Sequence, residues 1–381
     1  MLKRFRVDGY KSLSGIDVSL GDLTVVVGPN AAGKSNLLDA IYLLGRLGTT
    51  QTLNEAFAGH RGTPLEAFAV GEGGTASLIA KKWAKFTLSA DVYLEDAVVE
   101  AVEADIARMR EGLPEKDVNR PSARKRITER NLRYEVAVEI RTDTGLLRVA
   151  DERISALRVD GEVRESRRPY LEKMEHRLHL RMEGQSHPNY YDLGLDHTLL
   201  SRPLYPPHYP HMTALREELK RWRIYYFDPE QLRSESPLRE ATTLTPRGGD
   251  LAAYVNTLKA NDPKRYRSLV QALKFIIPAV EGVDVLTTAE GMLTLSVIEN
   301  GVPFSARVAS EGTLRVIGLL AITGADTPTS LVGYEEPENG VHPRRLELIA
   351  EVLRNSASRK HVQLLVNTHS PVLPGLMSDA T

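Results

Sequence analysis

The residues with the clearest chemical meaning are positions 28–35, which read Gly-Pro-Asn-Ala-Ala-Gly-Lys-Ser. They match the pattern G-x-x-x-x-G-K-[ST] of a phosphate-binding loop, or P-loop. An apolar run at 23–27 precedes them as a buried strand, and residues 36–44 follow with the apolar spacing of a helix. Backbone N–H groups of such a loop and the start of its helix bind anions. We therefore expect Lys34 to reach the β- and γ-phosphates of a nucleotide and Ser35 to bind Mg²⁺.

A pair of carboxylates follows a second apolar strand. Residues 330–343 read Ser-Leu-Val-Gly-Tyr-Glu-Glu-Pro-Glu-Asn-Gly-Val-His-Pro. In a nucleotide-hydrolysing site one carboxylate orients the Mg²⁺ shell and the next polarises the attacking water. We assign Glu335 to the metal and Glu336 to the water. Taken alone, the pair is equally consistent with an acidic surface turn.

Two further segments carry polar residues at the ends of regular elements. Residues 362–371 read Val-Gln-Leu-Leu-Val-Asn-Thr-His-Ser-Pro, so His369 follows an apolar strand and is a candidate for contact with the γ-phosphate. Residues 309–315 read Ala-Ser-Glu-Gly-Thr-Leu-Arg and open an apolar helix with Ser310 as its N-cap. This helix start is either a simple cap or a second phosphate-binding N-terminus, offered to a nucleotide on another subunit.

Composition limits the class of protein. The chain has 381 residues, 42% of them hydrophobic and 26% charged, with a net charge of −1 and no cysteine. Disulfides, zinc–thiolate sites and cysteine nucleophiles are therefore excluded. There is neither a run of 18 apolar residues nor an apolar signal-peptide core at the N-terminus, so we expect no membrane contact and a cytoplasmic location.

The order of elements predicts an α/β fold of the P-loop NTPase type. A strand–P-loop–helix begins the chain, strand–helix–strand ends it, and the two ends are expected to form one sheet. We expect a discontinuous head of residues 1–80 and 223–381, with residues 81–222 as an inserted mixed α/β region. Residues 46–80 and 184–211 read as irregular, 113–130 as a polar loop, and 146–149 and 154–159 as two separate strands.

Together these motifs resemble the ABC-type ATPases of the RecF, SMC and OLD group, and among them the small RecF-like ATPases often labelled AAA family. The resemblance covers the first forty-odd residues and roughly the last hundred and fifty. It implies an ABC-type ATPase head that binds ATP and Mg²⁺ and hydrolyses ATP. It also implies a homodimer on ATP binding, because in this group the signature motif of one chain, here 310–313, completes the site of the other.

The resemblance also implies residue roles. Glu336 would be the catalytic base and His369 the γ-phosphate sensor, with Ser35, Glu335 and the Q-loop candidate Gln231 around the metal. The nucleotide-binding residues would be Gly28, Pro29, Asn30, Ala31, Ala32, Gly33, Lys34, Ser35 and Asn36, together with Ser310, Glu311, Gly312 and Thr313 in trans.

Two departures from the group stand out. Many ABC proteins have Asp where Glu335 stands, although Glu can still serve a water-mediated Mg²⁺ shell. The sequence ends twelve residues after His369 and shows no acidic nuclease cluster. We therefore expect any nuclease activity to come from a separate partner protein.

Several functions stay open at this point. The arginines of 120–133 are a candidate DNA-phosphate patch, but such charge runs are more often solvated loops. The leading hypothesis is a nucleotide-gated ATPase acting on DNA or on a DNA-processing partner, in repair or anti-phage defence. The alternatives are a P-loop small-molecule kinase and a nucleotide-binding regulatory module without DNA contact.

Overall fold

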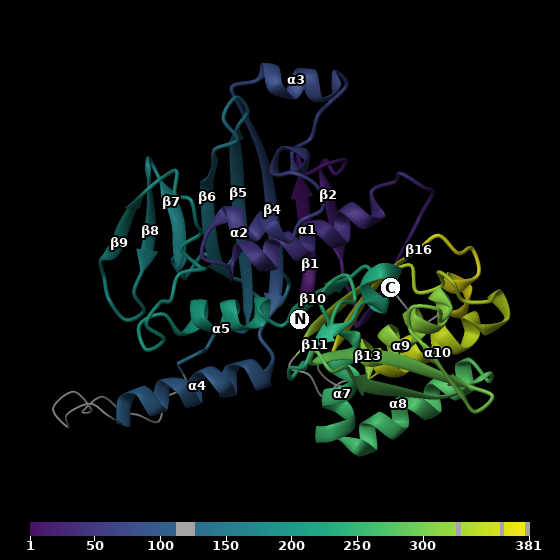
Figure 1. The fold of residues 1–381 in the computed structure, drawn as a ribbon. Coiled ribbons are helices and arrows are strands. Elements are labelled where there is room, and N and C mark those ends of the chain that lie inside the picture. Colours follow the sequence, from purple (N-terminus) through teal and green to yellow (C-terminus); the bar gives the residue numbers. More distant parts are fainter. Residues whose placement is uncertain (112–125, 325–328, 359–361, 378–381) are drawn as a thin grey trace. The chain divides into compact units, whose positions relative to one another are not determined.

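A computed structural model of the chain describes residues 1–111, 126–324, 329–358 and 362–377 (Figure 1). The chain divides into two compact units. Unit 1 contains Met1–Leu20 and Ser35–Trp222, and unit 2 contains Gly21–Lys34 and Arg223–Thr381. Residues 1–20 and 35–80, which we expected in the head, thus group with 81–222. The chain passes between the units inside the P-loop, after Lys34. The division into a functional head and an insertion stays a prediction.

Unit 1 is built on an eight-stranded antiparallel sheet in the order β2-β1-β4-β5-β6-β7-β8-β9. Figure 1 shows α1 and α2 crossing one face of this sheet, and α2 contacts β6. The strands are β1 (Leu2–Asp8), β2 (Ile16–Ser19), β4 (Trp83–Tyr93), β5 (Asn131–Arg141), β6 (Leu147–Ala156), β7 (Leu171–Met174), β8 (Arg177–Arg181) and β9 (Pro188–Asp192). The helices are α1 (Lys34–Leu47), α2 (Leu53–Ala58), α3 (Gly74–Ala80), α4 (Asp96–Glu111) and α5 (Pro210–Leu219), with a 3₁₀ turn at Pro64–Ala67.

Three segments of unit 1 differ from expectation. Residues 46–80, expected to be irregular, form α2, a 3₁₀ turn and α3, and the expected loop 184–211 contains β9. Expected strands at 146–149 and 154–159 are one strand, β6. The polar run at 151–153 interrupts its apolar pattern, yet Glu152 is buried there. Most of the expected loop 113–130 lies outside the described residues.

Unit 2 contains the expected sheet formed by the two ends of the sequence. Its order is β10-β15-β16-β3, with β15 parallel to β16 and β16 parallel to β3. Every residue of β15 and β16 is buried, as a parallel sheet covered on both faces requires. These strands are β3 (Leu23–Val27), β10 (Trp222–Tyr225), β15 (Leu331–Glu335) and β16 (Gln363–Thr368).

A second, antiparallel sheet and a group of helices complete unit 2. The sheet has the order β11-β13-β12, with β14 also pairing with β13. Helices α7 and α8 pack on β12, α8 contacts α9, and α10 contacts both α9 and β16. The remaining elements are β11 (Ser236–Pro237), β12 (Val280–Thr287), β13 (Met292–Glu299), β14 (Val302–Ser305), α6 (Pro229–Arg233), α7 (Leu251–Asn261), α8 (Pro263–Ile276), α9 (Glu311–Thr323) and α10 (Leu346–Ala357), with 3₁₀ turns at Pro343–Arg345 and Leu373–Leu376.

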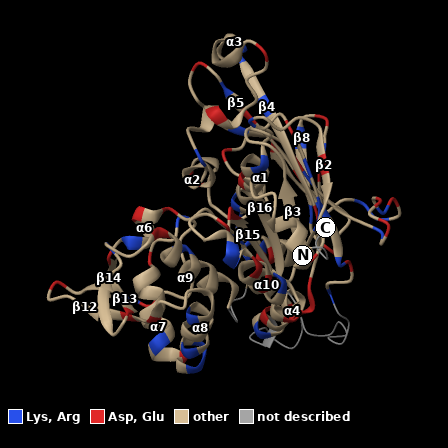
Figure 2. Cartoon of the chain, turned by 90° about the vertical axis from the view of Figure 1, so that its right-hand side faces the viewer, with Lys and Arg blue, Asp and Glu red and all other residues tan. Residues whose placement is uncertain are grey.

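Charged residues in unit 1 are largely paired. Figure 2 shows basic and acidic residues interspersed along its strands. Asp91 on β4 binds both Arg6 and Arg133, and Arg148 binds Glu139. Across the described ranges, no helix is long and apolar enough to cross a membrane.

Candidate nucleotide site

The P-loop connects β3 to α1 through a backbone that includes residues in positive-φ conformations. Gly33 has φ +90°, a conformation open to glycine at little cost. Ala31 also has a positive φ, +65°, which costs a residue with a Cβ about 1 kcal/mol. Helix α1 begins at Lys34, so its positive end faces the loop. The loop and helix start thus have the form of an anion-binding nest.

Lys34 is buried inside this loop, with 6% of its surface exposed. Its Nζ donates to the carbonyl oxygens of Gly28 at 2.7 Å and Pro29 at 2.8 Å. The same Nζ lies 3.3 Å from Nδ1 of His369. One ammonium therefore connects the P-loop to the segment that follows β16.

The carboxylate pair lies at the end of β15, beside β16. Glu335 is the last residue of the strand, 8% exposed, and its Cα pairs in register with Asn367. Glu336 leaves the strand with φ +49°, and its N–H donates to both the backbone and side-chain oxygens of Asn367, each at 3.1 Å. Asn339 donates from Nδ2 to Oε2 of Glu336. These contacts fix the direction of the Glu336 carboxylate.

His369 lies between the lysine and the candidate base. Its Nε2 is 3.1 Å from Oε1 of Glu336, while its Nδ1 faces the Lys34 ammonium. A neutral imidazole satisfies both contacts, because Nδ1 can accept from Lys34 while Nε2–H donates to Glu336. The structure therefore brings together Lys34, His369 and Glu336 from three separate segments.

The start of α9 is placed against the turn that follows Glu336. Ser310 caps the helix by accepting from the N–H of Thr313 at 3.1 Å, and its hydroxyl lies 2.8 Å from that of Thr313. A Cβ at Gly312 would lie 1.8 Å from the carbonyl oxygen of Gly340, so the two backbones are in direct contact. Glu311 pairs with Arg315 on the same helix. Whether this helix start also serves a second nucleotide stays a prediction.

These residues fit a nucleotide with Mg²⁺ by their chemistry. The nest and the ammonium are donors suited to phosphate oxygens. Mg²⁺ at phosphate sites takes one or two protein oxygens together with phosphate and water, and the Ser35 hydroxyl and Glu335 carboxylate are oxygens of that kind. Among the described residues, the candidate site included, no three His, Asp or Glu side chains form a group able to hold a metal ion by themselves.

Comparison with known families decides the class of the chain. Residues 23–91 and 197–373 match the family described as "AAA domain, putative AbiEii toxin, Type IV TA system". The matched residues include the P-loop, helix α9, the carboxylate pair and His369. The chain belongs to this family.

Relatives of this AAA-domain protein agree with that assignment. An OLD nuclease of Thermus scotoductus (strain ATCC 700910 / SA-01) is 52% identical over 44 residues, which are 12% of this chain and 8% of the nuclease. The matched part thus covers only a small share of that relative. The family and this relative confirm the expected resemblance to RecF, SMC and OLD ATPases.

Solved structures confirm the ABC-type head fold. An Smc head bound to the C-terminal winged-helix domain of ScpA has a TM-score of 0.55 at 13% identity, over 100% of this chain and 91% of the other. The Pyrococcus furiosus Smc head with an extended coiled coil, bound to the C-terminal domain of ScpA, has a TM-score of 0.53 at 12% identity, over 98% and 91%. At such identities the likeness concerns the fold alone.

The side chains of two predicted site residues, Asn36 and Gln231, contact other parts of the AAA-domain protein. Asn36 donates from Nδ2 to the Ser12 hydroxyl at 2.8 Å. Gln231 lies on α6, which packs against α9, and its side-chain oxygen faces Gly249. A nucleotide role for Asn36 and a metal role for Gln231 stay predictions.

The candidate DNA-phosphate segment is only partly described. Arg120, Arg124 and Lys125 lie outside the described residues. The described arginines are engaged in structural contacts: Arg126 with the carbonyl oxygen of Pro207, Arg130 with Asp96, and Arg133 with Asp91. The described part of this segment is therefore no free phosphate-binding patch.

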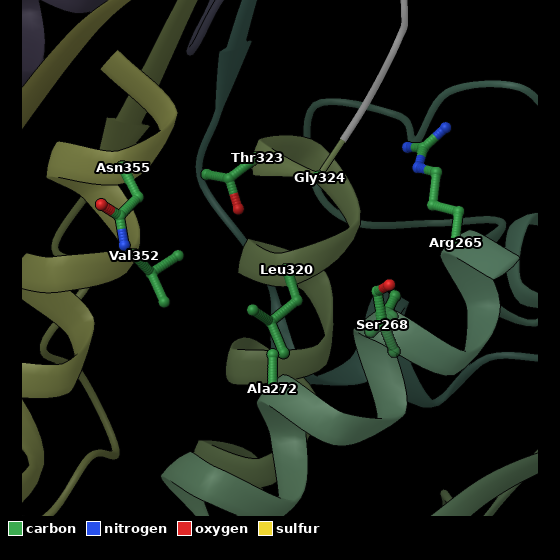
Figure 3. Close-up of a pocket in the computed structure, with 9 residues that line it drawn as sticks. Arg265, Ser268, Ala272, Leu320, Thr323, Gly324, Val352 and Asn355 are labelled. Carbon is green, nitrogen blue, oxygen red and sulfur yellow. The ribbon is translucent and has the colours of Figure 1, made fainter. Parts of the chain in front are cut away.

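A separate cavity of about 240 Å³ lies between α8, α9 and α10 (Figure 3). Its lining includes apolar side chains such as Leu320 and Val352 together with Arg265, Ser268, Thr323 and Asn355. It shares no lining residue with the candidate nucleotide site.

Sequence reasoning missed three residues that hold the site together. Asn339, Asn367 and Glu338 fix Glu336 and the segment of His369 through hydrogen bonds. The only sequence signal is their position beside the assigned residues in the motifs at 330–343 and 362–371. Which donor each oxygen accepts becomes visible only when the two strands are paired.

Proposed function

We propose that this AAA-domain protein binds ATP with Mg²⁺ in its P-loop and hydrolyses it to ADP and phosphate. The observation that carries the proposal is the contact series Lys34–His369–Glu336 at the ends of β3, β15 and β16. It unites a phosphate-binding cation, a polar sensor and a carboxylate base at one edge of a parallel sheet, where ligands of open α/β sheets bind.

Each residue has a defined task in this proposal. Glu336 accepts the proton of the water that attacks the γ-phosphorus, so one P–O bond forms as the β–γ bridging bond breaks. Lys34 stabilises negative charge on the phosphate oxygens. Mg²⁺, when bound, would neutralise charge on the β- and γ-phosphates.

Nucleotide binding is expected to change the position of the His369 side chain. The ammonium of Lys34 has three N–H donors and three acceptors around it, the carbonyls of Gly28 and Pro29 and the imidazole of His369. A phosphate oxygen on Lys34 must replace one of them. His369 would then be released from Lys34 toward the γ-phosphate while Glu336 still orients it.

The proposal extends to assembly and to a biological target. A homodimer in which each Ser310–Thr313 segment completes the partner's site would close the open side of the γ-phosphate. An OLD nuclease relative supports action on DNA or with a DNA-processing partner, such as a separate nuclease, in repair or defence.

Phosphate release distinguishes this function from the alternatives. We expect the protein alone to release phosphate from Mg²⁺–ATP without any acceptor molecule. Glu336→Gln should bind ATP but turn it over at least roughly a hundredfold more slowly. Glu335→Gln should instead raise the Mg²⁺ concentration needed for binding. A wild-type rate in Glu336→Gln would refute the assigned base, and release only with an added acceptor would support a kinase.

A further inference from the structure

Glu338 has no role in the proposed reaction, yet one of its carboxylate oxygens accepts three hydrogen bonds beside the site. Its Oε1 accepts from the Thr368 hydroxyl at 2.5 Å, the His369 N–H at 2.9 Å and the Ser370 N–H at 3.1 Å. All three donors belong to the turn that carries His369. One carboxylate oxygen therefore fixes the backbone from which the imidazole extends.

Part of this anchor is shielded from solvent. Thr368 is 1% exposed, and Oε2 of Glu338 is buried without a hydrogen-bond partner among the described residues. Glu338 as a whole is half-buried, and loss of its Oε1 contacts would leave three donors of the His369 turn without this acceptor. Hydrogen bonds to a charged group are also stronger than those between neutral groups.

Glu338 is also joined to the start of α9. The turn is closed by backbone bonds from Asn339 N to Glu336 O and from Val341 N to Glu338 O, both at 3.0 Å. Gly340, with φ +73°, ends it against Gly312. A shift of the α9 N-terminus would push on the turn directly, because no side chain lies between the two glycines to absorb it.

We propose that Glu338 is a positioning residue for His369, and that the 336–341 turn passes the position of the α9 N-terminus to it. The inference rests on the proposed ATPase function.

The first test compares Glu338→Ala, Glu338→Gln, His369→Ala and the double variant Glu338→Ala/His369→Ala. Glu338→Ala should lower kcat roughly ten- to hundredfold with little change in KM, because the imidazole is displaced while the P-loop is intact. Glu338→Gln should retain most activity, since its amide oxygen can accept the same bonds. The double variant should be no slower than His369→Ala. Additive losses, or a Gln variant as slow as Ala, would overturn the proposal.

The second test needs no ATPase activity, so it separates failure of this inference from failure of the proposed function. Hydrogen exchange of the His369 and Ser370 amides should accelerate in Glu338→Ala, while that of Leu365 within β16 is unchanged. The exposed Glu351→Ala is the matched control and should leave both amides protected. Gly312→Ala should accelerate the same two amides if the turn transmits motion. Unchanged exchange in Glu338→Ala would refute the anchor, and unchanged exchange in Gly312→Ala would refute the transmission.

Discussion

At the scale of single residues, Lys34 has the largest expected effect on ligand binding. ATP with Mg²⁺ should raise the Tm of the wild-type chain through binding to the folded state. Lys34→Ala removes the ammonium that would contact the phosphates, together with its hydrogen bonds to two loop carbonyls. Most of that rise in Tm should therefore disappear. Thermal shift measurements with and without Mg²⁺–ATP check this, with the exposed Lys81→Ala as control. An unchanged ATP-dependent rise in Lys34→Ala would contradict the P-loop assignment.

Glu152 gives a pH dependence that can be measured without ligand. It is completely buried, and burial raises its pKa from 4.5 to about 7, although N–H groups of Leu199 and Leu200 at 2.6 and 3.1 Å partly oppose the rise. The folded chain therefore holds this proton to higher pH than the unfolded chain does. Stability from Glu152 is full below pH 4.5 and is lost as pH rises to about 7.

Denaturant unfolding between pH 4.5 and 8 tests this. A shift from 4.5 to about 7 corresponds to about 3 kcal/mol of unfolding free energy. Glu152→Gln cannot titrate, so the fall of stability over this range should shrink by that amount, even if the variant is less stable throughout. Equal pH slopes in both proteins would show that Glu152 does not keep its proton.

Residue types in the motifs were sufficient to predict the reactive side chains, but not the residues that position them. Lys34, Glu336 and His369 could be assigned from motifs because phosphate binding and proton transfer need those side chains. Asn339 and Glu338 could not, because an amide or carboxylate after a strand has many ordinary uses. Their roles depend on which segment of another strand lies opposite.

At the scale of elements, the contact between α9 and the 336–341 turn leaves no room for a side chain at Gly312. Gly312→Ala would place a Cβ 1.8 Å from Gly340 O, so either α9 or the turn must move. We expect a loss of about 1–3 kcal/mol in unfolding free energy, as for other overpacked sites. Gly375→Ala is the control, since a Cβ there meets nothing within 4 Å. Equal stability of the two variants would contradict the close contact.

Elements were predictable where one physical signal dominated. The buried runs of β15 and β16 and the periodic apolar face of α10 were anticipated, because burial on both faces or on one face leaves a plain pattern. Helix α2 was missed because six residues are too short for periodicity, although Thr52 caps it. Strand β6 was split because Glu152 interrupts its apolar pattern and is buried through hydrogen bonds to a distant turn.

At the scale of the whole molecule, the sequence order predicted that the two ends meet in one sheet, and β3 indeed pairs with β16. It did not predict the division of the chain between Lys34 and Ser35, since compactness depends on contacts far apart in sequence. Assembly also belongs to this scale. In the proposed shared site, Ser310–Thr313 of one copy supplies phosphate donors to the nucleotide of another copy.

Steric blockade of the α9 N-terminus supplies the control for assembly. Ser310→Arg adds a long cation beside the helix start, where the partner's nucleotide would lie. It should prevent association while leaving ATP binding by the single chain nearly intact, since Lys34 and its loop are unchanged. Equilibrium ATP binding by this variant must therefore be measured beside its mass.

Light scattering of Glu336→Gln with and without Mg²⁺–ATP tests the shared nucleotide site most directly, because it measures the mass of the assembly. Because this variant should bind ATP without cleaving it, we predict a monomer mass without nucleotide and a dimer mass with it. Glu336→Gln combined with Ser310→Arg should stay monomeric under both conditions. A Glu336→Gln mass that remains monomeric at micromolar concentration, with bound ATP demonstrated, would contradict the shared site and indicate a self-contained NTPase.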